Sequence, residues 1–345
     1  MNNPSHLRLL SLLCLTTPLL AQGTEHDLRI AAKKGTSVWL LQEAKQEQAI
    51  DMGGQQMDMG NTTVHTLHLT VKDVDDKGNL VVETEIVRIH GSMSNPMMGD
   101  IDFDSAKKAA GDDDDEGGGM GMSPGMITKA MTALAGKSFV ARVDPFGKVA
   151  SLEGVAELLA DAKKNAGGMG GAMAQAASEA TFRQFVESAF GTRPSKPMAT
   201  GGTWDHADNE KGVRMPMRSK LQLTLAKVDA DNFEVTAVGT VEKADAKGEE
   251  GDDSPMNEMR KSMKVKNGKV SGSQRVSRQD GFIVEAKNVT TMDLDMASPM
   301  GGDMSMNMKV TTTTKRTTAD AAVPAKKAAP AKDEAKKEEG AKSGK

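Results

Sequence analysis

Thiols and tyrosines are nearly or wholly missing from this chain of 345 residues. Its one cysteine, Cys14, lies in the N-terminal segment, and the chain has no tyrosine and only two tryptophans. If residues 1–21 are removed, the remainder has no thiol, which excludes a disulfide, a cysteine zinc site and a thiol nucleophile. Few aromatic rings are left to stack on bases, and 44 basic residues nearly balance 48 acidic ones. Nothing therefore favours a nucleic-acid partner.

Long apolar runs are also missing. Arg8, the apolar stretch Leu9–Leu15 and the small-residue motif "PLLAQG" predict a signal peptide over residues 1–21, cleaved after Ala21. A short buried helix is the alternative. The stretch is too short to cross a bilayer, and no later run approaches the roughly 18 apolar residues that a spanning helix needs. We therefore expect an exported protein, periplasmic or extracellular, that is not transmembrane.

Catalytic and metal-binding motifs are missing as well. The chain has no G-x-S-x-G elbow and no H-E-x-x-H helix. His65 and His68 are three residues apart on a predicted strand, so they point to opposite faces and cannot share a metal. Acidic stretches that start at Asp73 and Asp112 imitate calcium loops but lack the final glutamate. We expect no enzyme activity, no catalytic residue, no metal site and no cofactor.

The main positive signal is the alternation of apolar and polar residues, which predicts antiparallel strands. The predicted strands cover 36–50, 63–74, 79–89, 214–229, 232–243, 261–279, 282–296 and 304–318, with a further hairpin over 138–154 that turns at Asp144–Gly147. Residues 75–78, Asn267-Gly268 and Asp280-Gly281 are predicted hairpin turns. Helical spacing predicts helices over 154–166 and 178–191, with Ser178 as N-cap and Gly191 as the stop.

Two parts of the chain resemble each other. Residues 67–89 align with 221–243, and each stretch follows a Gly-to-Trp opening that ends at Trp39 or Trp204. The expected fold class is therefore α+β, with a large curved antiparallel sheet made from two related β-meanders and partly covered by two or three helices. We expect one domain over 22–318, with the repeat at 36–89 and 203–243; a duplicated domain pair is the alternative.

Three glycine- and acid-rich stretches and the C-terminus do not fit the strand pattern. Residues 105–125, 165–177 and 244–255 are expected to be flexible loops, and the Ala/Lys/Glu/Pro-rich tail 319–345 is expected to be disordered.

Methionine is abundant, with 25 copies. In "MDLDMASPMGGDMSMNMKV" (292–310), Met292, Leu294 and Met296 share one face of a predicted strand. Met304, Met306 and Met308 share one face of the next, and polar residues fill the alternate positions. This parity favours an apolar face over a cluster of thioether ligands for Cu(I). Met300, in the turn between the strands, and Met120, Met122 and Met126, in a loop, are not covered by the parity.

Several stretches together resemble a family of exported bacterial proteins of unknown function with Met-rich alternating strands. They include "LTVKDVDDKGNLVVETEIVRI", "LAGKSFVARVDPFGKVASLEG" and "GKVSGSQRVSRQDGFIVEAKNVTTMDLDM", and the resemblance covers most of residues 28–318. It carries no active site to transfer. The closing hairpins are also similar to the half-barrels of periplasmic lipoprotein carriers, and this likeness implies a sheet curved round helices that holds acyl chains.

The functional hypothesis follows from the flexibility of methionine. If Met292, Leu294, Met296, Met304, Met306 and Met308 line the concave face, they offer a deformable apolar cavity, because methionine repacks at low cost. We hypothesise an exported, non-enzymatic protein that binds a lipid or another apolar envelope ligand there. Cu(I) binding through methionine clusters and a purely structural envelope module are the alternatives. The sequence does not fix the oligomeric state.

Overall fold

The computed structural model describes residues 24–96, 99–107, 132–165, 178–208, 217–244, 262–297 and 303–322. Predicted features outside these ranges are the signal peptide 1–21, nearly all of the three loops, the tail beyond residue 322, and Met120, Met122, Met126 and Met300. The tail prediction is wrong at its start, because Ala319–Ala322 form the short helix α6.

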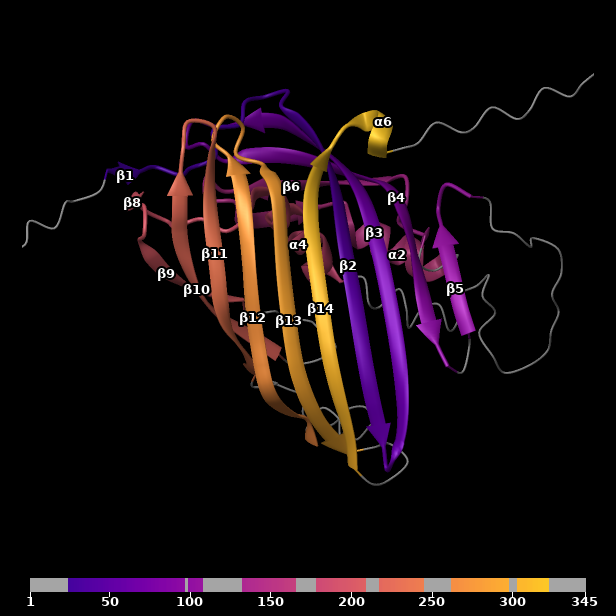
Figure 1. Cartoon of the computed structure of the whole chain (residues 1–345). Helices are drawn as coiled ribbons and strands as arrows, with labels where there is room; N and C mark the ends of the chain where they lie inside the picture. Colours follow the sequence, from indigo (N-terminus) through magenta and orange to yellow (C-terminus); the bar gives the residue numbers. More distant parts are fainter. Residues whose placement is uncertain are drawn as a thin grey trace, which may run out of the picture.

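A 12-stranded antiparallel sheet dominates the structure (Figure 1). Its main path runs β7-β6-β4-β3-β2-β14-β13-β12-β11-β10-β9, and β5 pairs with the lower half of β4. The sheet is open, and its path ends at β7 and β9. The predicted α+β class with one large antiparallel sheet is confirmed. The strands are β2 (Ser37–Met52), β3 (Gln55–Val74), β4 (Leu80–Asn95), β5 (Gly99–Asp104), β6 (Lys137–Val143), β7 (Val149–Glu153), β9 (Thr203–Asp208), β10 (Met217–Val228), β11 (Asn232–Lys243), β12 (Lys264–Ser277), β13 (Ile283–Ala297) and β14 (Asp303–Thr317).

Two runs of consecutive strands build most of this sheet. Strands β2 to β4 form one meander, and β9 to β14 form a second that returns to pair β14 with β2 over 14 residue pairs. A separate two-stranded sheet joins β1 (Glu25–His26) to β8 (Met198–Ala199). That the segments 36–89 and 203–243 are a repeat stays a prediction. Their tryptophans are not equivalent, since Trp39 stacks on outward-facing His68 whereas Trp204 packs against the core.

Most predicted turns are confirmed, and one is wrong. Residues 75–78 and 144–147 close hairpins, and Asp280-Gly281 lies in a loop between β12 and β13 that Arg316 holds through Asp280 at 3.0 Å. Asn267-Gly268 is instead a β-bulge inside β12, where Asn267 has φ +52° and the register shifts against β13. Two residues face one partner there, and asparagine tolerates the left-handed backbone that such a bulge requires.

The first hairpin is longer than the alternation predicts. Strands β2 and β3 continue through "DMGGQQMDM", and Gly53-Gly54 makes the tight turn with φ values of 63° and 95°. Glycine is needed here because both turn residues have positive φ. The methionines of this stretch therefore belong to strand ends.

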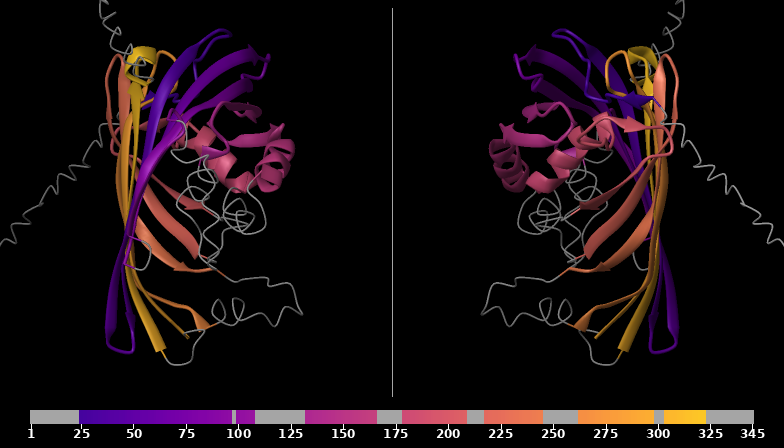
Figure 2. Two further views of the ribbon diagram at one scale, coloured as in Figure 1. Left: turned by 90° about the vertical axis from the view of Figure 1, so that its right-hand side faces the viewer. Right: turned by 90° about the vertical axis from the view of Figure 1, so that its left-hand side faces the viewer.

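Two helices lie on the concave side of the sheet, near one of its ends (Figure 2). These are α2 (Val155–Asn165) and α4 (Glu179–Phe190), as predicted. Ser178 caps α4 and forms a capping box with Thr181, and the Gly191 N–H bonds to the Glu187 carbonyl. We call the face that α4 covers the inner face and the opposite one the outer face.

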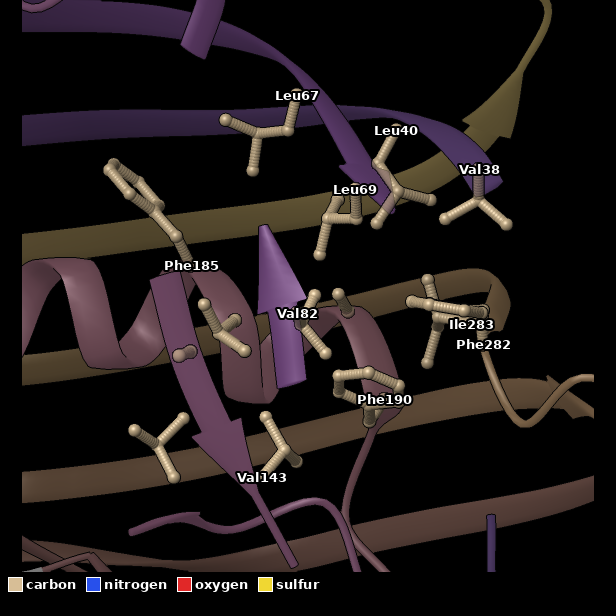
Figure 3. Close-up of a cluster of buried hydrophobic side chains, with 14 of the residues drawn as sticks. Val38, Leu40, Leu67, Leu69, Val82, Val143, Phe185, Phe190, Phe282 and Ile283 are labelled. Atoms are coloured by element: carbon tan, nitrogen blue, oxygen red, sulfur yellow. The ribbon is translucent and has the colours of Figure 1, made fainter. Parts of the chain in front are cut away.

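A cluster of buried aliphatic and phenylalanine side chains, which we call the aliphatic core, fills the space between α4 and the upper half of the sheet, where β2 begins. Figure 3 shows Phe185 and Phe190 of α4 beside Leu40, Leu67 and Val82 of the strands. The rings of Phe139 and Phe182 meet edge to face with centroids 5.1 Å apart, and Phe190 stacks on Phe282 at 4.5 Å. This burial is the main source of stability for the upper half.

Arg193 links three parts of the chain from within this core. Its guanidinium donates to the carbonyls of Leu28 at 2.6 Å, of Phe190 at 3.1 Å and of Gly281, and it lies 5.2 Å from the centre of the Phe233 ring. Burial lowers the pKa of Arg193 to about 9, so the group remains charged at neutral pH. Arg193 thus holds the N-terminal segment, the end of α4 and the β12–β13 loop together.

Replacing Arg193 with methionine should lower the free energy of unfolding by about 3 kcal/mol, because three buried carbonyls lose their donor. Urea denaturation measures this change. The control is Arg142→Met on the outer face, where Arg142 pairs with exposed Glu153 and the loss should stay within about 0.5 kcal/mol. Equal losses in the two variants would contradict the linking role of Arg193.

His65 should make stability depend on pH. It contacts Phe185 with ring centroids 4.8 Å apart, and burial, helped by repulsion from His90, lowers its pKa to about 4 from 6.5. The unfolded chain then binds the proton more readily than the folded one, so stability falls as pH drops from 6.5 to 4, by up to about 3 kcal/mol.

The His65→Gln variant should lose this part of the pH dependence when the free energy of unfolding is measured between pH 7 and pH 4. Thr63→Val is the control on the same strand and face; it removes no titratable group and should keep the wild-type slope. A slope unchanged in His65→Gln would rule out the role of His65.

Candidate ligand-binding face

The lower half of the inner face carries a second apolar cluster, which we call the methionine patch. All six predicted residues belong to it, and three pairs of them stand directly opposite each other: Met292 with Met308, Leu294 with Met306, and Met296 with Met304. Their exposed fractions range from 0% to 8%. The buried members of the patch are Ile50, Val241, Met263, Met292, Leu294, Met296, Met304, Met306 and Met308.

The pairing of β14 with β2 places the patch on the same face as the aliphatic core. Met306 faces Ile50 and Met304 faces Met52, while Leu40 of the core lies on the same face of β2. The curvature of the sheet brings in Val241 from β11 and Met217 from β10 (Figure 2). The predicted common apolar face is therefore confirmed; whether it binds a ligand stays a prediction.

The outer face of the same strands is polar, as the parity predicts. Asp293 accepts hydrogen bonds from Asn267 at 2.9 Å and Asn307 at 2.6 Å, and these bonds lower the pKa of its carboxyl. Lys266 pairs with Asp295 beside them. Strands β13 and β14 thus separate a charged, hydrogen-bonded surface from a surface of thioethers and leucine.

Methionine is segregated between the two clusters. Six of the nine buried members of the patch are methionines, whereas none of the 29 buried members of the aliphatic core is. All members of the patch come from strands or from Met263, which precedes β12; none lies on a described helix. The part of the inner face to which the described helices α2 and α4 contribute no buried residue is therefore the part built from methionine.

Two glutamines border the patch on β2. The side-chain amides of Gln46 and Gln48 donate to the sulfur of Met308, at 3.4 Å and 3.8 Å. A thioether is a weak acceptor, so these amides keep most of their capacity to bond elsewhere. Sequence reasoning missed both residues, because the pairing of β2 with β14 joins positions about 260 residues apart.

Methionines from other strands lie beside or outside the patch. Met52 and Met59 pack against it from β2 and β3, and Met93 lies on β4. Among the described residues, no group of three His, Cys, Asp or Glu side chains is placed to hold a metal ion. Likewise, no helix in those ranges has the length and apolar character needed to cross a membrane.

Two hollows are found beside β11 to β14. The larger, of about 540 Å³, is lined by residues such as Glu234, Arg275 and Lys315, and the smaller, of about 360 Å³, by residues such as Val238 and Lys269. Neither is lined by any of the six predicted residues. Those six form a packed cluster on the sheet.

His65 and His68 lie on opposite faces, as predicted. His68, on the outer face, lies 2.6 Å from the Ser37 hydroxyl, and its other ring nitrogen is 3.7 Å from Glu85. These are the residue types of a hydrolase triad, but the Glu85 distance exceeds hydrogen-bond range and Ser37 is exposed. The group is a polar surface network; sequence reasoning missed it because three strands must pair to assemble it.

Solved structures that resemble the chain do so only distantly. The structure of lipid–protein interactions in lipovitellin is 9% identical with a TM-score of 0.40, over 83% of this chain but only 25% of that chain. The COG4313 outer membrane channel from Pseudomonas putida F1 is 7% identical, with a TM-score of 0.23 over 84% of this chain and 98% of that one. A DUF1329 family protein from Desulfovibrio piger is 10% identical, with a TM-score of 0.14 over 83% and 89%. These scores are too low to carry an argument about function.

Sequence comparison is more informative. No curated protein matches the chain. Residues 77–283, from the turn before β4 to the first residue of β13, match the model of DUF6263, which is described as a family of unknown function. Because this match covers more than half of the sequence, the chain belongs to that family of unknown function.

Proposed function

We propose that this protein is an exported, non-enzymatic carrier that holds an apolar ligand with an acyl chain against the methionine patch. The observation that carries the proposal is the segregation of methionine, with six of nine buried residues in the patch and none of 29 in the aliphatic core. Met198 packs at the margin of the aliphatic core, but no methionine belongs to its buried interior, and a chain that needed only a second core would have no reason for this uneven distribution.

The physical property that distinguishes methionine here is adaptability. It is unbranched, has three rotatable side-chain bonds and carries a polarizable sulfur, so it fits irregular apolar shapes at low cost. The patch is nearly fully buried without a ligand, so binding requires its side chains to rearrange and admit an acyl chain. Buried residues of the patch span the strands from β2 to β11, a width of roughly 20 Å at about 4.8 Å per strand, which provides an elongated apolar surface.

The outer face suits a protein that is soluble outside the cytoplasm. Its side chains form cross-strand ion pairs such as Lys72–Glu83 and Arg275–Glu285. Export rests on the sequence pattern at residues 1–21. Mass measurement of the secreted chain tests it, because cleavage after Ala21 should leave Gln22 as the first residue.

Native mass spectrometry of the protein purified from its source tests the carrier function. We expect a bound mass of acyl-lipid size that is released by organic solvent and does not change when Cu(I) is added. Copper that is retained in a fixed ratio against a competing chelator would instead support thioether ligation. A chain that carries neither lipid nor copper would leave a purely structural module.

Substitutions in the patch should separate shape from sulfur chemistry. The triple variant Met304→Leu, Met306→Leu, Met308→Leu should keep the bound lipid, with affinity changed less than about threefold, because apolar volume is conserved. Met306→Asp should lose it, since a buried carboxylate opposes an acyl chain. Ser305→Asp adds the same charge one residue away on the exposed outer face and should keep the lipid. If Met306→Asp does not fold, Met306→Asn takes its place, and lipid retention by the replacement would contradict the proposal.

A further inference from the structure

Between the aliphatic core and the methionine patch, the inner face changes character. Two rows of residues that pair across successive strands run over the inner face from β4 to β11. Each strand contributes one inward side chain to each row. We call their hydrogen-bonding residues the amide band: Gln46, Asn61, Thr63, Asn288, Thr290 and Thr312. The band begins directly below α4, where Gln42 donates to the Phe185 carbonyl at 3.1 Å and the Ser188 hydroxyl at 2.8 Å.

No acidic or basic residue occupies either row over these seven strands. The remaining positions are alanine, glycine, valine and Met93. The outer face at the neighbouring registers of the same strands is charged, with Glu43, Lys45, Glu47, Lys269, Lys287 and Lys309. Charge is therefore confined to the outer side, and the inner side presents only neutral donors and acceptors.

These neutral groups have spare hydrogen-bonding capacity. Within the part of the chain that the structure describes, the Gln46 amide donates only to the weak acceptor sulfur of Met308, at 3.4 Å. The exposed Asn288 side chain lies over Gly272, where an added Cβ would come within 2.0 Å of the Asn288 amide oxygen. Glycine at 272 leaves the space that this amide occupies. Both amides therefore lie at the inner surface, Gln46 beside Met308 and Asn288 opposite Thr312, four residues farther along β14.

We infer that the amide band binds the uncharged, oxygen-bearing head group of an amphiphile whose acyl chain lies on the methionine patch. This inference rests on the proposed carrier function, because it assigns the second half of the same ligand. An anionic head group would lose water at a half-buried surface that offers no cation in return, which is costly. Ester and hydroxyl oxygens lose less, and the side-chain amides replace the hydrogen bonds that water had made.

Two probes with the same acyl chain test the head-group preference on the purified full chain. Monooleoylglycerol has an uncharged ester and diol head, whereas oleate carries a carboxylate; each competes with a fluorescent acyl ester for the protein. At pH 7.5 we expect monooleoylglycerol to bind at least about tenfold more tightly than oleate. Gln46→Leu should weaken monooleoylglycerol binding by about five- to tenfold, the range of one lost hydrogen bond.

The matched control is Glu47→Gln, the next residue on β2, whose side chain lies on the outer face and should not affect either probe. Asn288→Lys places an ammonium group in the band at an exposed position that disturbs packing little, and should raise oleate affinity at least about tenfold. This variant keeps the inference testable if Gln46→Leu does not fold.

The outcomes separate the two claims. If neither probe competes, the carrier function itself fails. If both compete but oleate binds as tightly as monooleoylglycerol, or if Gln46→Leu and Asn288→Lys leave both affinities unchanged, the head-group assignment is overturned while acyl binding stands.

Discussion

The antiparallel pairing of β14 with β2 is the contact on which the inner face depends. It joins the last strand of the chain to the first long one through 14 residue pairs without a register shift. Because side chains alternate along a strand, an unbroken register carries the same face from Leu40 at the helix-covered end to Met304 at the other. A slip by one residue would turn the methionines of β14 to the outer side and put Asn307 and Lys309 inside. The methionine patch, the amide band and the aliphatic core share one surface because this register holds.

The described helices α2 and α4 cover only part of the inner face of this sheet. Helix α4, with 12 residues, packs Phe182, Phe185 and Phe190 against the sheet. The core there is made of branched and aromatic residues that pack in defined rotamers. Farther along the same strands, the sheet presents amides and then methionine. Each fully buried methionine contributes roughly 2 kcal/mol, so the patch still stabilises the long strand ends. Methionine is also the residue type whose side chain rearranges at the lowest cost.

Local patterns predict most of the strands, both helices and the common face of Met292, Leu294 and Met296, because alternation and capping involve neighbours in sequence. They do not predict the short strands β5 and β9. What they miss depends on partners that lie far away along the chain. Asn267-Gly268 predicts a hairpin turn, yet β13 continues past it and the dipeptide becomes a bulge. No sequence pattern predicts the role of Arg193, because the fold brings together its three carbonyl partners, Leu28, Phe190 and Gly281. Gln46 and Gln48 look like solvent-facing strand residues until β14 places the Met308 sulfur beside them.

The contacts of Met308 also bear on the choice between lipid and copper. The Met308 sulfur accepts two weak hydrogen bonds from amides, and a metal bound to this sulfur would have to take the place of both donors. An acyl chain competes for no lone pair, because it needs only the apolar surface of the side chain. The same two amides then mark where that surface ends and hydrogen bonding begins, next to a band of neutral residues on β2, β13 and β14. Apolar contacts on one side of Met308 and uncharged donors on the other match the two ends of a neutral amphiphile.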